Sequence, residues 1–316
     1  MPHKKVSVSI VSYNNKGFLT DCLPAVLGQD YPGVEVVLVD NASTDGTVEF
    51  VRENFPSVQI IENDRNYFFC KGHNIGIKNT TGEYVLVLNS DVVLADGFIS
   101  EMVRAMESGD RVGAVSGKIL RTGGELIDTT GLFLGRDRRP VERGYGEPDR
   151  GLYDKPGFIF GAGGVAPLYR RTMLDDLAVD GEYFDETFEA FYEDLDLAWR
   201  AARRGWKAYY TPLAVAWHKR GGTAKTKTPP LGLFKNNNLA YLSDEMTARV
   251  MRNRCLTVIK NDNLLDFLLN LPFILLYDIK IWAFISLFSP GAVPYFIKGL
   301  GALPIAWRRR KKLDET

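Results

Sequence analysis

Short apolar segments alternate with helix-like segments over the first hundred residues, and this alternation restricts the fold more than any other feature. Residues Val6–Ser12, Val34–Val39 and Tyr84–Leu88 are the clearest strand candidates. The two later segments are almost entirely apolar, which is typical of strands that are buried on both faces. Apolar strands that alternate with helices predict a mostly parallel central sheet with helices on both faces. We therefore expect an α/β fold.

The other elements follow from the same kind of periodicity. Residues 121–155 are rich in Gly, Arg and Asp and predict loops with short strands, and residues 221–230 predict a mobile loop or linker. We expect further helices at residues 17–28, 44–54, 72–79 and 98–107, and further strands at residues 58–62, 114–120, 208–211 and 214–218.

Polar residues stand directly after three of the predicted strands, where a parallel sheet binds its ligands. They are Ser12 to Asn15, Asp40 to Gly46, and Asn89 to Asp91. Asp91 could hold Mg²⁺ or Mn²⁺, because these hard cations favour carboxylates together with substrate phosphates. Asp40 could accept hydrogen bonds from a nucleobase or a ribose. The alternative is that these residues only end strands and cap the helices that follow.

Several classes of protein are disfavoured by what the sequence contains. Neither G-x-G-x-x-G nor G-x-x-x-x-G-K-[ST] follows these strands, so neither a dinucleotide fingerprint nor a P-loop is available. The formal net charge is zero, and we therefore expect no nucleic-acid partner. Cys22, Cys70 and Cys255 lack metal or disulfide spacing, which fits a reducing compartment. The N-terminal segment alternates like a strand and has no signal-peptide h-region, so we expect a cytoplasmic protein.

Three carboxylates, Glu193, Asp194 and Asp196, stand within four residues at the start of a helix-forming run. Acids favour the first turn of a helix, so Asp194 could be an N-cap and nothing more. Clustered carboxylates also repel one another, which raises a pKa and suits a general base. This segment alone leaves both interpretations open. A single histidine such as His218 is more often structural than a ligand, but this one could join Asp91 at a metal ion.

Taken together, these motifs resemble glycosyltransferase family 2, and they are most similar to its bacterial rhamnosyltransferase-like branch. The resemblance spans residues 5–220 and continues more weakly over residues 253–261. A single motif says little, but their order along the chain is specific. The matching segments are Val8–Asn14, Val39–Gly46, Asn66 to Gly76, Leu88–Asp91, Gly161-Ala162, Glu193–Leu197 and Trp217-His218.

The resemblance implies the GT-A nucleotide-diphospho-sugar transferase fold and transfer of a sugar from a nucleotide donor with inversion. It makes Asp194 the catalytic base, and Asp91 and His218 the ligands of a Mg²⁺ or Mn²⁺ ion on the donor diphosphate. The chemistry agrees, because a leaving nucleoside diphosphate needs a cation and inversion needs a base on the opposite face. The resemblance also implies a nucleotide site at Ser12, Tyr13, Asn14, Asp40, Lys71, Asn74 and Asn89, and acceptor-binding or base-tuning roles for Gly161, Ala162, Glu193 and Asp196. Asp196 could equally face solvent.

The chain departs from the family pattern at two places. Asn89 stands where the metal motif usually begins with aspartate, so we expect Asp91 to be the one carboxylate ligand in that motif. Bulky Phe68 and charged Lys71 stand where the family usually has glycines. Lys71 could pair with the diphosphate, or this loop could have a different shape.

The C-terminal part has a different composition. Residues 264–307 are strongly apolar, and residues 308–312 are all basic. Charges and prolines interrupt the apolar run, so we expect short amphipathic helices that lie in a membrane interface and do not span it. The alternative is a helical homodimer interface buried in protein. The interrupting residues are Asp266, Pro272, Asp278, Lys280, Pro290, Pro294 and Pro304, and Trp282, Tyr295 and Trp307 would lie near headgroup level.

We therefore predict a GT-A catalytic domain at residues 1–225, with a nucleotide-sugar half at 1–115 and an acceptor half at 116–225, followed by a C-terminal helical module at 226–316. The expected protein is a metal-dependent inverting glycosyltransferase, peripheral at the inner face of a bacterial membrane. It would extend a surface polysaccharide or a polyprenyl-linked saccharide. The first candidate donor is dTDP-rhamnose, and the alternative is a UDP-hexose, UDP-N-acetylhexosamine or UDP-galactofuranose.

Two rivals come from other classes. A non-catalytic nucleotide-sugar-binding module would keep the pocket without transfer, and the intact set of Asp91, Asp194 and His218 argues against it. A nucleotidyltransferase is disfavoured because no glycine-rich basic loop follows the first strand.

Overall fold

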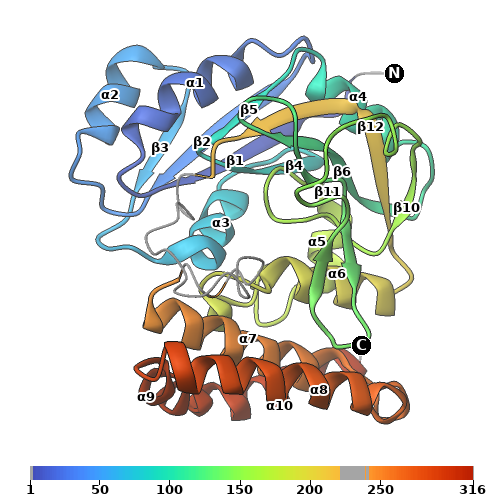
Figure 1. Ribbon diagram of the computed structural model, residues 1–316. Coiled ribbons are helices and arrows are strands. Elements are labelled where there is room, and N and C mark those ends of the chain that lie inside the picture. Colours follow the sequence, from blue (N-terminus) through green and yellow to red (C-terminus); the bar gives the residue numbers. More distant parts are fainter. Residues whose placement is uncertain (1–2, 221–238, 240–241, 316) are drawn as a thin grey trace. The chain divides into compact units, whose positions relative to one another are not determined.

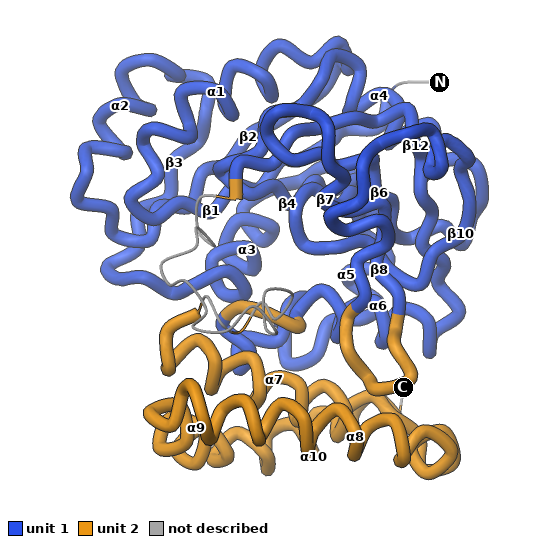
Figure 2. The backbone as a smooth tube through the Cα atoms, viewed as in Figure 1, with its two compact units in different colours: residues 1–133, 141–189, 193–219 blue, residues 134–140, 190–192, 220–316 orange. Residues whose placement is uncertain are grey.

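The computed structural model describes residues 3–220, 239 and 242–315, which form two compact units (Figures 1 and 2). Unit 1 comprises residues 1–133, 141–189 and 193–219, and unit 2 comprises residues 134–140, 190–192 and 220–316. Two short segments, 134–140 and 190–192, thus belong to the C-terminal unit although they are distant from it in sequence. The predicted linker at 221–230, and with it the predicted domain boundary at residue 225, lies outside the described residues.

Unit 1 contains a ten-stranded sheet in the order β10-β12-β6-β11-β4-β1-β2-β3, with β5 beside β12 and β7 beside β6. Strands β3, β2, β1 and β4 are parallel, as the alternation predicted, whereas β11 is antiparallel to both β4 and β6. The predicted α/β fold is confirmed. The strands are β1 Val6–Ser12, β2 Val34–Asp40, β3 Gln59–Glu62, β4 Tyr84–Asn89, β5 Val92–Leu94, β6 Val112–Arg121, β7 Ile127–Thr129, β10 Gly157–Ile159, β11 Leu168–Arg170 and β12 Lys207–His218, while β8 Leu132–Leu134 and β9 Pro140–Glu142 form a two-stranded sheet.

The helices of unit 1 lie on both faces of its sheet (Figure 1). Alternate side chains of β1 point to opposite faces. Val8 and Ile10 belong to the main apolar core, which also includes side chains of helices α1 and α4. On the other face Ser9 approaches α3 so closely that a Cβ on Gly76 would clash with the Ser9 hydroxyl. The helices are α1 Lys16–Leu27, α2 Thr47–Asn54, α3 Phe68–Lys78, α4 Phe98–Met106, α5 Arg171–Leu177, the 3₁₀ turn η1 Glu186–Phe188 and α6 Glu193–Arg203.

Unit 2 is built from helices α7 Asp244–Asn261, α8 Leu264–Phe288, α9 Ala292–Gly299 and α10 Leu303–Glu315, with the 3₁₀ turn η5 Leu300–Ala302. The first two helices begin with capping side chains. The Ser243 hydroxyl accepts a hydrogen bond from the Met246 backbone N–H (3.2 Å), and the Asn263 amide oxygen accepts one from the Asp266 N–H (2.9 Å). Within this unit Arg138 donates two hydrogen bonds to the Asp262 carboxylate, which fastens segment 134–140 to the end of α7.

The prediction of only short helices in this part of the chain is wrong for α8. This helix is continuous over 25 residues and includes Pro272. Asp278 does not interrupt it, and its carboxylate pairs with Arg254 of α7 at 2.9 Å. The helix ends at Phe288, shortly before the predicted interruption at Pro290. Within the described part of the chain, α8 is the one helix long and apolar enough to cross a membrane by length and composition.

We predict a pH-dependent contribution of Glu35 to the stability of unit 1. Partial burial favours the protonated acid, but hydrogen bonds from Lys5, Ser7 and the Thr81 N–H outweigh it and lower the pKa of Glu35 to about 2. A depressed pKa stabilises the fold above the unfolded value of 4.5, and this stabilisation is lost as the pH falls towards 2. Glu35→Gln should lower the free energy of unfolding by about 1 kcal/mol at pH 7.

Urea unfolding of the variant and the wild type over a pH series tests this prediction. The difference between the two proteins should shrink below pH 4.5. Glu62→Gln is the matched control, because Glu62 forms an exposed ion pair with Arg52, whose loss should cost less than about 0.5 kcal/mol. A Glu35→Gln effect that stays constant with pH would contradict the assignment.

Candidate active site

The register of the parallel strands brings the predicted nucleotide residues to one edge of the sheet. Ser12 at the end of β1 is level with Asp40 at the end of β2, and Val11 is level with Asn89 at the end of β4. Both Ser12 and Asp40 are buried, whereas the side chain of Tyr13 is 48% exposed. At this edge the Tyr13 residue is therefore exposed to solvent, whereas the polar residues Ser12 and Asp40 are buried.

Hydrogen bonds join the loops that follow β1 and β2. The Asp40 carboxylate accepts from the Ser43 backbone N–H (2.8 Å) and from the Ser43 hydroxyl (2.6 Å). Asn14 donates its N–H to the Ser43 hydroxyl and accepts from the Thr44 N–H, each at 2.8 Å. These contacts connect the loop after β1 to the loop after β2, and they hold Asn14 and Asp40 in place by hydrogen bonds to Ser43 and Thr44.

The two predicted nucleotide residues of α3 lie in different environments. The Lys71 ammonium lies 4.0 Å from the centre of the Tyr67 ring. Lys71 belongs to the first turn of α3, because this helix begins at Phe68 and not at residue 72 as predicted. Asn74 is buried, and its amide bonds to the backbone N–H and C=O of Phe184 (2.9 and 2.7 Å) and to the Tyr183 N–H (3.2 Å). The Asn74 amide thus connects α3 to segment 183–186.

Asp91 and His218 meet at the same end of the sheet. His218 ends β12 and is paired in register with Val92 of β5, directly after Asp91. Its Nε2 lies 3.2 Å from Asp91 Oδ1, and its Nδ1 lies 2.7 Å from Oδ2 of Asp128 on β7. Burial opposes protonation of His218, but the carboxylates of Asp128 and Asp91 outweigh it and raise its pKa to about 9. Asp128 is not among the predicted site residues, because it lies in a segment predicted as loops with short strands and carries no motif.

Asp194 is the second residue of α6, so it is not the N-cap that the simpler interpretation made it. Its carboxylate accepts hydrogen bonds from the backbone N–H groups of Gly164 (3.1 Å) and Leu195 (2.7 Å). Burial raises the pKa of Asp194, and the same two N–H groups oppose that shift. The largest cause is therefore desolvation, which was not considered from sequence. A cavity of about 10 Å³ beside it is lined by apolar side chains such as Ala162 and Leu197.

Backbone contacts connect Asp194 to the end of β4. Gly164, which donates to the Asp194 carboxylate, is followed by Val165, whose carbonyl accepts a hydrogen bond from the Asn89 N–H at 3.0 Å. Asn89 stands two residues before Asp91. The structure thus brings the predicted base close to the strand end that carries the predicted metal ligand.

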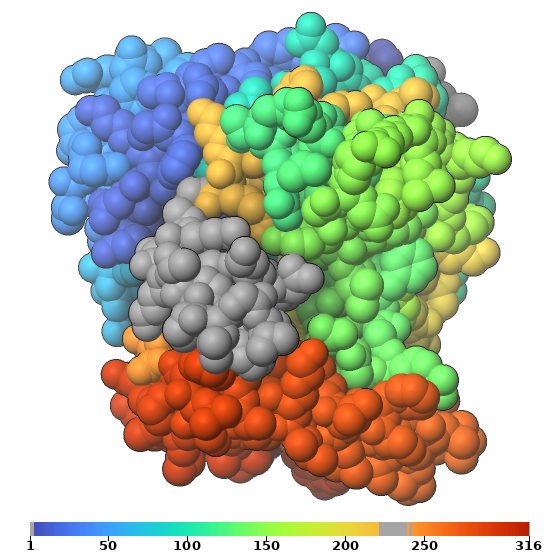
Figure 3. All heavy atoms as spheres, in the orientation of Figure 1, coloured from blue at the N-terminus to red at the C-terminus, as the bar shows by residue number. Residues whose placement is uncertain are grey.

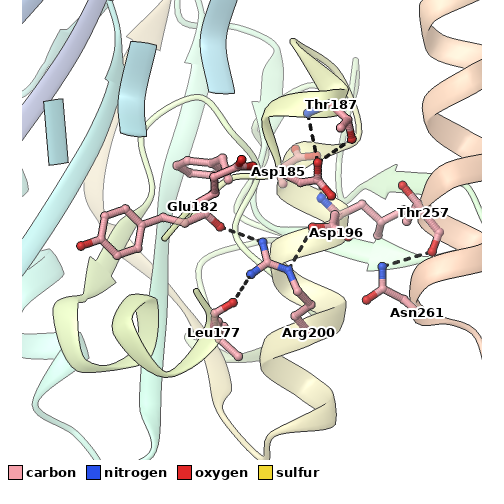
Figure 4. A network of polar contacts seen from close by, with 12 residues as sticks. Leu177, Glu182, Asp185, Thr187, Asp196, Arg200, Thr257 and Asn261 are labelled. Atoms are coloured by element: carbon pink, nitrogen blue, oxygen red, sulfur yellow. Dashed lines mark hydrogen bonds and ion pairs between the residues drawn. The ribbon is translucent and has the colours of Figure 1, made fainter. Parts of the chain in front are cut away.

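The other acidic and small residues of the predicted acceptor set are buried. Asp196 does not face solvent, since it is fully buried and pairs with Arg200 at 3.0 Å (Figure 4). Arg200 also donates to the carbonyls of Leu177 (2.6 Å) and Tyr183 (2.8 Å). Glu193 is buried beside Asp194 at the start of α6.

Gly161 and Ala162 lie where α6 packs against the chain. A Cβ on Gly161 would clash with the methyl group of Ala198, so glycine permits the close approach of α6. Gly161 also exchanges backbone hydrogen bonds with Leu132 (2.8 and 3.1 Å), and Ala162 is buried. Residues 121–133 and 141–155, drawn in green, form part of the surface of unit 1 in the space-filling view (Figure 3).

Comparisons with known proteins place these features in context. The family model described as "Glycosyl transferase family 2" matches residues 7–177. Poly-beta-1,6-N-acetyl-D-glucosamine synthase of Staphylococcus epidermidis is 24% identical over 214 residues, which cover 67% of this chain and 49% of that protein. The synthase of Staphylococcus aureus strain MW2 is 23% identical over 215 residues, with the same coverage. The chain therefore spans about half the length of these curated relatives.

Solved structures share the GT-A fold with this chain. The mannosyltransferase PcManGT from Pyrobaculum calidifontis, in complex with GDP-Man and Mn²⁺, aligns with a TM-score of 0.56 and 21% identity, covering 96% of this chain and 76% of that one. Residues 1–349 of S. aureus TarS, in complex with UDP-GlcNAc, align with a TM-score of 0.58 and 20% identity, covering 98% and 83%. At these identities the likeness shows the fold alone.

We predict that substitutions at Asp194 and Asp196 affect stability to different degrees. Asp196→Asn removes one partner of a buried ion pair and should lower the free energy of unfolding by about 3 kcal/mol. Asp194→Asn removes a carboxylate whose raised pKa makes its ionised form unfavourable at neutral pH, but its amide offers one acceptor oxygen to two N–H groups, so this variant should lose less stability than Asp196→Asn. Urea unfolding at pH 7 measures both variants. A large loss of stability in Asp194→Asn would contradict the proposed desolvation.

Proposed function

This chain belongs to glycosyl transferase family 2, and from that membership we propose that it is an inverting glycosyltransferase that uses a nucleotide-diphosphate sugar. The acceptor would be a saccharide or a polyprenyl-linked saccharide of a bacterial surface polysaccharide. The observation that carries the proposal is the hydrogen-bonded path from Asp194 through Gly164 and Val165 to Asn89. This path connects a desolvated carboxylate to the strand end that precedes Asp91, which supports the separate base and metal carboxylates that an inverting transfer needs.

Among donors we favour a UDP-N-acetylhexosamine over dTDP-rhamnose. The curated relatives reported above are named poly-N-acetylglucosamine synthases, and one of the similar folds holds UDP-GlcNAc. The rhamnosyltransferase-like branch stays a prediction, as do a UDP-hexose and UDP-galactofuranose. Tyr13, which is about half exposed at the end of β1, is the proposed surface for the base.

Asp91 and His218 have the donor atoms that a divalent cation requires. A carboxylate and an imidazole 3.2 Å apart fit Mg²⁺ or Mn²⁺, and both side chains are shielded from bulk water. No group of three or more His, Cys, Asp or Glu side chains suited to a metal occurs among the described residues, so the remaining ligands would be diphosphate oxygens and water. Bound there, the cation would stabilise the charge that develops on the departing nucleoside diphosphate.

Asp194 is proposed to take the proton from the acceptor hydroxyl. The N–H groups of Gly164 and Leu195 hold its carboxylate in one orientation. Burial raises its pKa above the usual range of an aspartate, which brings its basicity closer to that required of a general base. We propose that Asp196 has no part in this step, since Arg200 already pairs with its carboxylate. Gly161 supports the packing of α6 and thus the position of Asp194.

We further propose that unit 2 binds a membrane surface through α8. Leu265, Leu269, Leu276 and Ile279 are 63–71% exposed and follow one another at spacings of four, seven and three residues, which places them on one face of the helix. The basic residues 308–312 would add attraction to anionic lipids. The length of α8 also permits a membrane-spanning arrangement, and burial in a homodimer is the alternative occupant of the same face.

Asp194→Asn should abolish most sugar transfer without loss of donor binding. The loss in kcat is expected to be about 10²–10⁴-fold, which is the usual contribution of a general base. UDP-GlcNAc with Mn²⁺ is the first donor to test, in a screen that includes dTDP-rhamnose and other UDP-sugars. The thermal shift that the nucleotide and Mn²⁺ produce should be the same in the variant and the wild type. Transfer within a few-fold of wild type would remove Asp194 from the role of base.

Vesicle flotation tests the membrane proposal with the full chain. The double variant Leu269→Asp with Leu276→Asp should lose most binding to vesicles that contain anionic lipid, because charges then interrupt the apolar face of α8. Leu152→Asp with Leu213→Asp is the matched control, since both leucines are 66–74% exposed in unit 1. Release of the protein from the vesicles by high salt or carbonate would indicate that α8 lies in the membrane interface and does not span the membrane. Equal flotation of both double variants would contradict the proposal.

A further inference from the structure

His218 is held from two sides by carboxylates. Its Nδ1 lies 2.7 Å from Asp128 Oδ2, and its Nε2 lies 3.2 Å from Asp91 Oδ1. An ionised carboxylate can only accept hydrogen bonds, so the contact with Asp128 places a hydrogen on Nδ1. Nε2 is therefore the ring nitrogen directed at Asp91.

An irregularity in strand pairing delivers the Asp128 side chain. Ile119 of β6 pairs with Thr129 of β7, but the next residue of β6, Leu120, pairs with Ile127. Asp128 is thus the extra residue of a β-bulge, a feature that redirects side chains and often occurs beside functional sites. On the other side of β6, β12 places His218 level with Arg121. The bulge and this register bring two residues together that are 90 positions apart in sequence.

Burial of the Asp128 side chain also has a high free-energy cost. Only 1% of it is exposed, and a buried carboxylate is costly unless it is paired and hydrogen-bonded. Arg121 offsets part of this cost with its Nε 3.6 Å from Asp128 Oδ1, and the Arg121 guanidinium stacks on Tyr145 with 4.5 Å to the ring centre. A buried carboxylate that contacts the Nδ1 atom of His218 indicates a functional role for Asp128 in addition to packing.

We propose that Asp128 is a positioning residue that fixes the ring orientation and tautomer of His218, so that Nε2 faces a divalent cation shared with Asp91. The inference rests on the metal site of the proposed function and adds the residue that prepares it. A carboxylate that hydrogen-bonds the far nitrogen of a metal-bound histidine commonly changes metal affinity about 10–100-fold. Asp128 does not touch the substrate, so its loss should act through the affinity of His218 for the cation.

Titration of Mn²⁺ into the full chain, with and without UDP, tests this inference. Asp128→Leu keeps the branched shape of the side chain but removes the acceptor, and it should weaken Mn²⁺ binding about 10–100-fold by calorimetry. Asp128→Asn retains an acceptor oxygen for Nδ1 and should lose less affinity. Pulsed electron paramagnetic resonance supplies a second readout. The coupling of Mn²⁺ to an imidazole nitrogen should be present in the wild type, absent in His218→Gln and weakened in Asp128→Leu.

Asp149→Asn is the matched control. It also converts a paired carboxylate into an amide, next to the buried Lys118, and should cost stability without changing Mn²⁺ affinity. Thermal unfolding identifies folded variants, and Asp128→Asn decides the question if Asp128→Leu does not fold. Wild-type Mn²⁺ affinity in every folded Asp128 variant, with the expected loss in His218→Gln, overturns this inference alone. Absence of Mn²⁺ binding by the wild type overturns the proposed metal site together with it.

Discussion

The in-register parallel pairing of β1 with β2 and β4 is the constraint on which the rest of the site depends. It sets Ser12 level with Asp40 and Val11 level with Asn89, so that the loops carrying Tyr13 and Asp91 leave the sheet at one edge. A shift of one residue would turn every core side chain of β1 to the opposite face. The burial of residues such as Val8 and Ile10 therefore also determines where the polar loops begin.

Two aspartates in the first turn of α6, Asp194 and Asp196, have different hydrogen-bond partners and therefore different properties. Asp196 is buried against Arg200, and the pair anchors the carbonyls of Leu177 and Tyr183. The Asp194 carboxylate is held by backbone N–H groups instead. Burial then raises its pKa, because neutral donors compensate a desolvated charge less completely than an ion pair does. The residue that the proposed chemistry needs as a base is thus the one that is bound by neutral donors and not by an arginine.

Long periodic elements were predictable because their signals are local. β1 and the bounds of β2, β4, α1 and α4 agree with the sequence-based expectation to within about two residues, which is the usual uncertainty of element ends. Contacts with distant partners were not predictable. Asp278 of α8 pairs with Arg254 of α7, and Asn74 is bound to segment 183–186, 110 residues away. Local patterns carry no information about such partners.

The sequence by itself determined the parallel α/β half, the order of polar loops at its ligand edge and the family to which the chain belongs. Apolar β-branched strands and the polar residues after them are sufficient for the first two, because their spacing is readable along the chain, whereas the family follows from the resemblance of the ordered motifs. Only the tertiary structure decided which side chains and N–H groups each carboxylate contacts. Asp128 reaches His218 across 90 residues through a bulge, and the Gly164 N–H reaches Asp194 across 30. Contacts of that kind depend on strand register and burial, which exist only once the chain has folded.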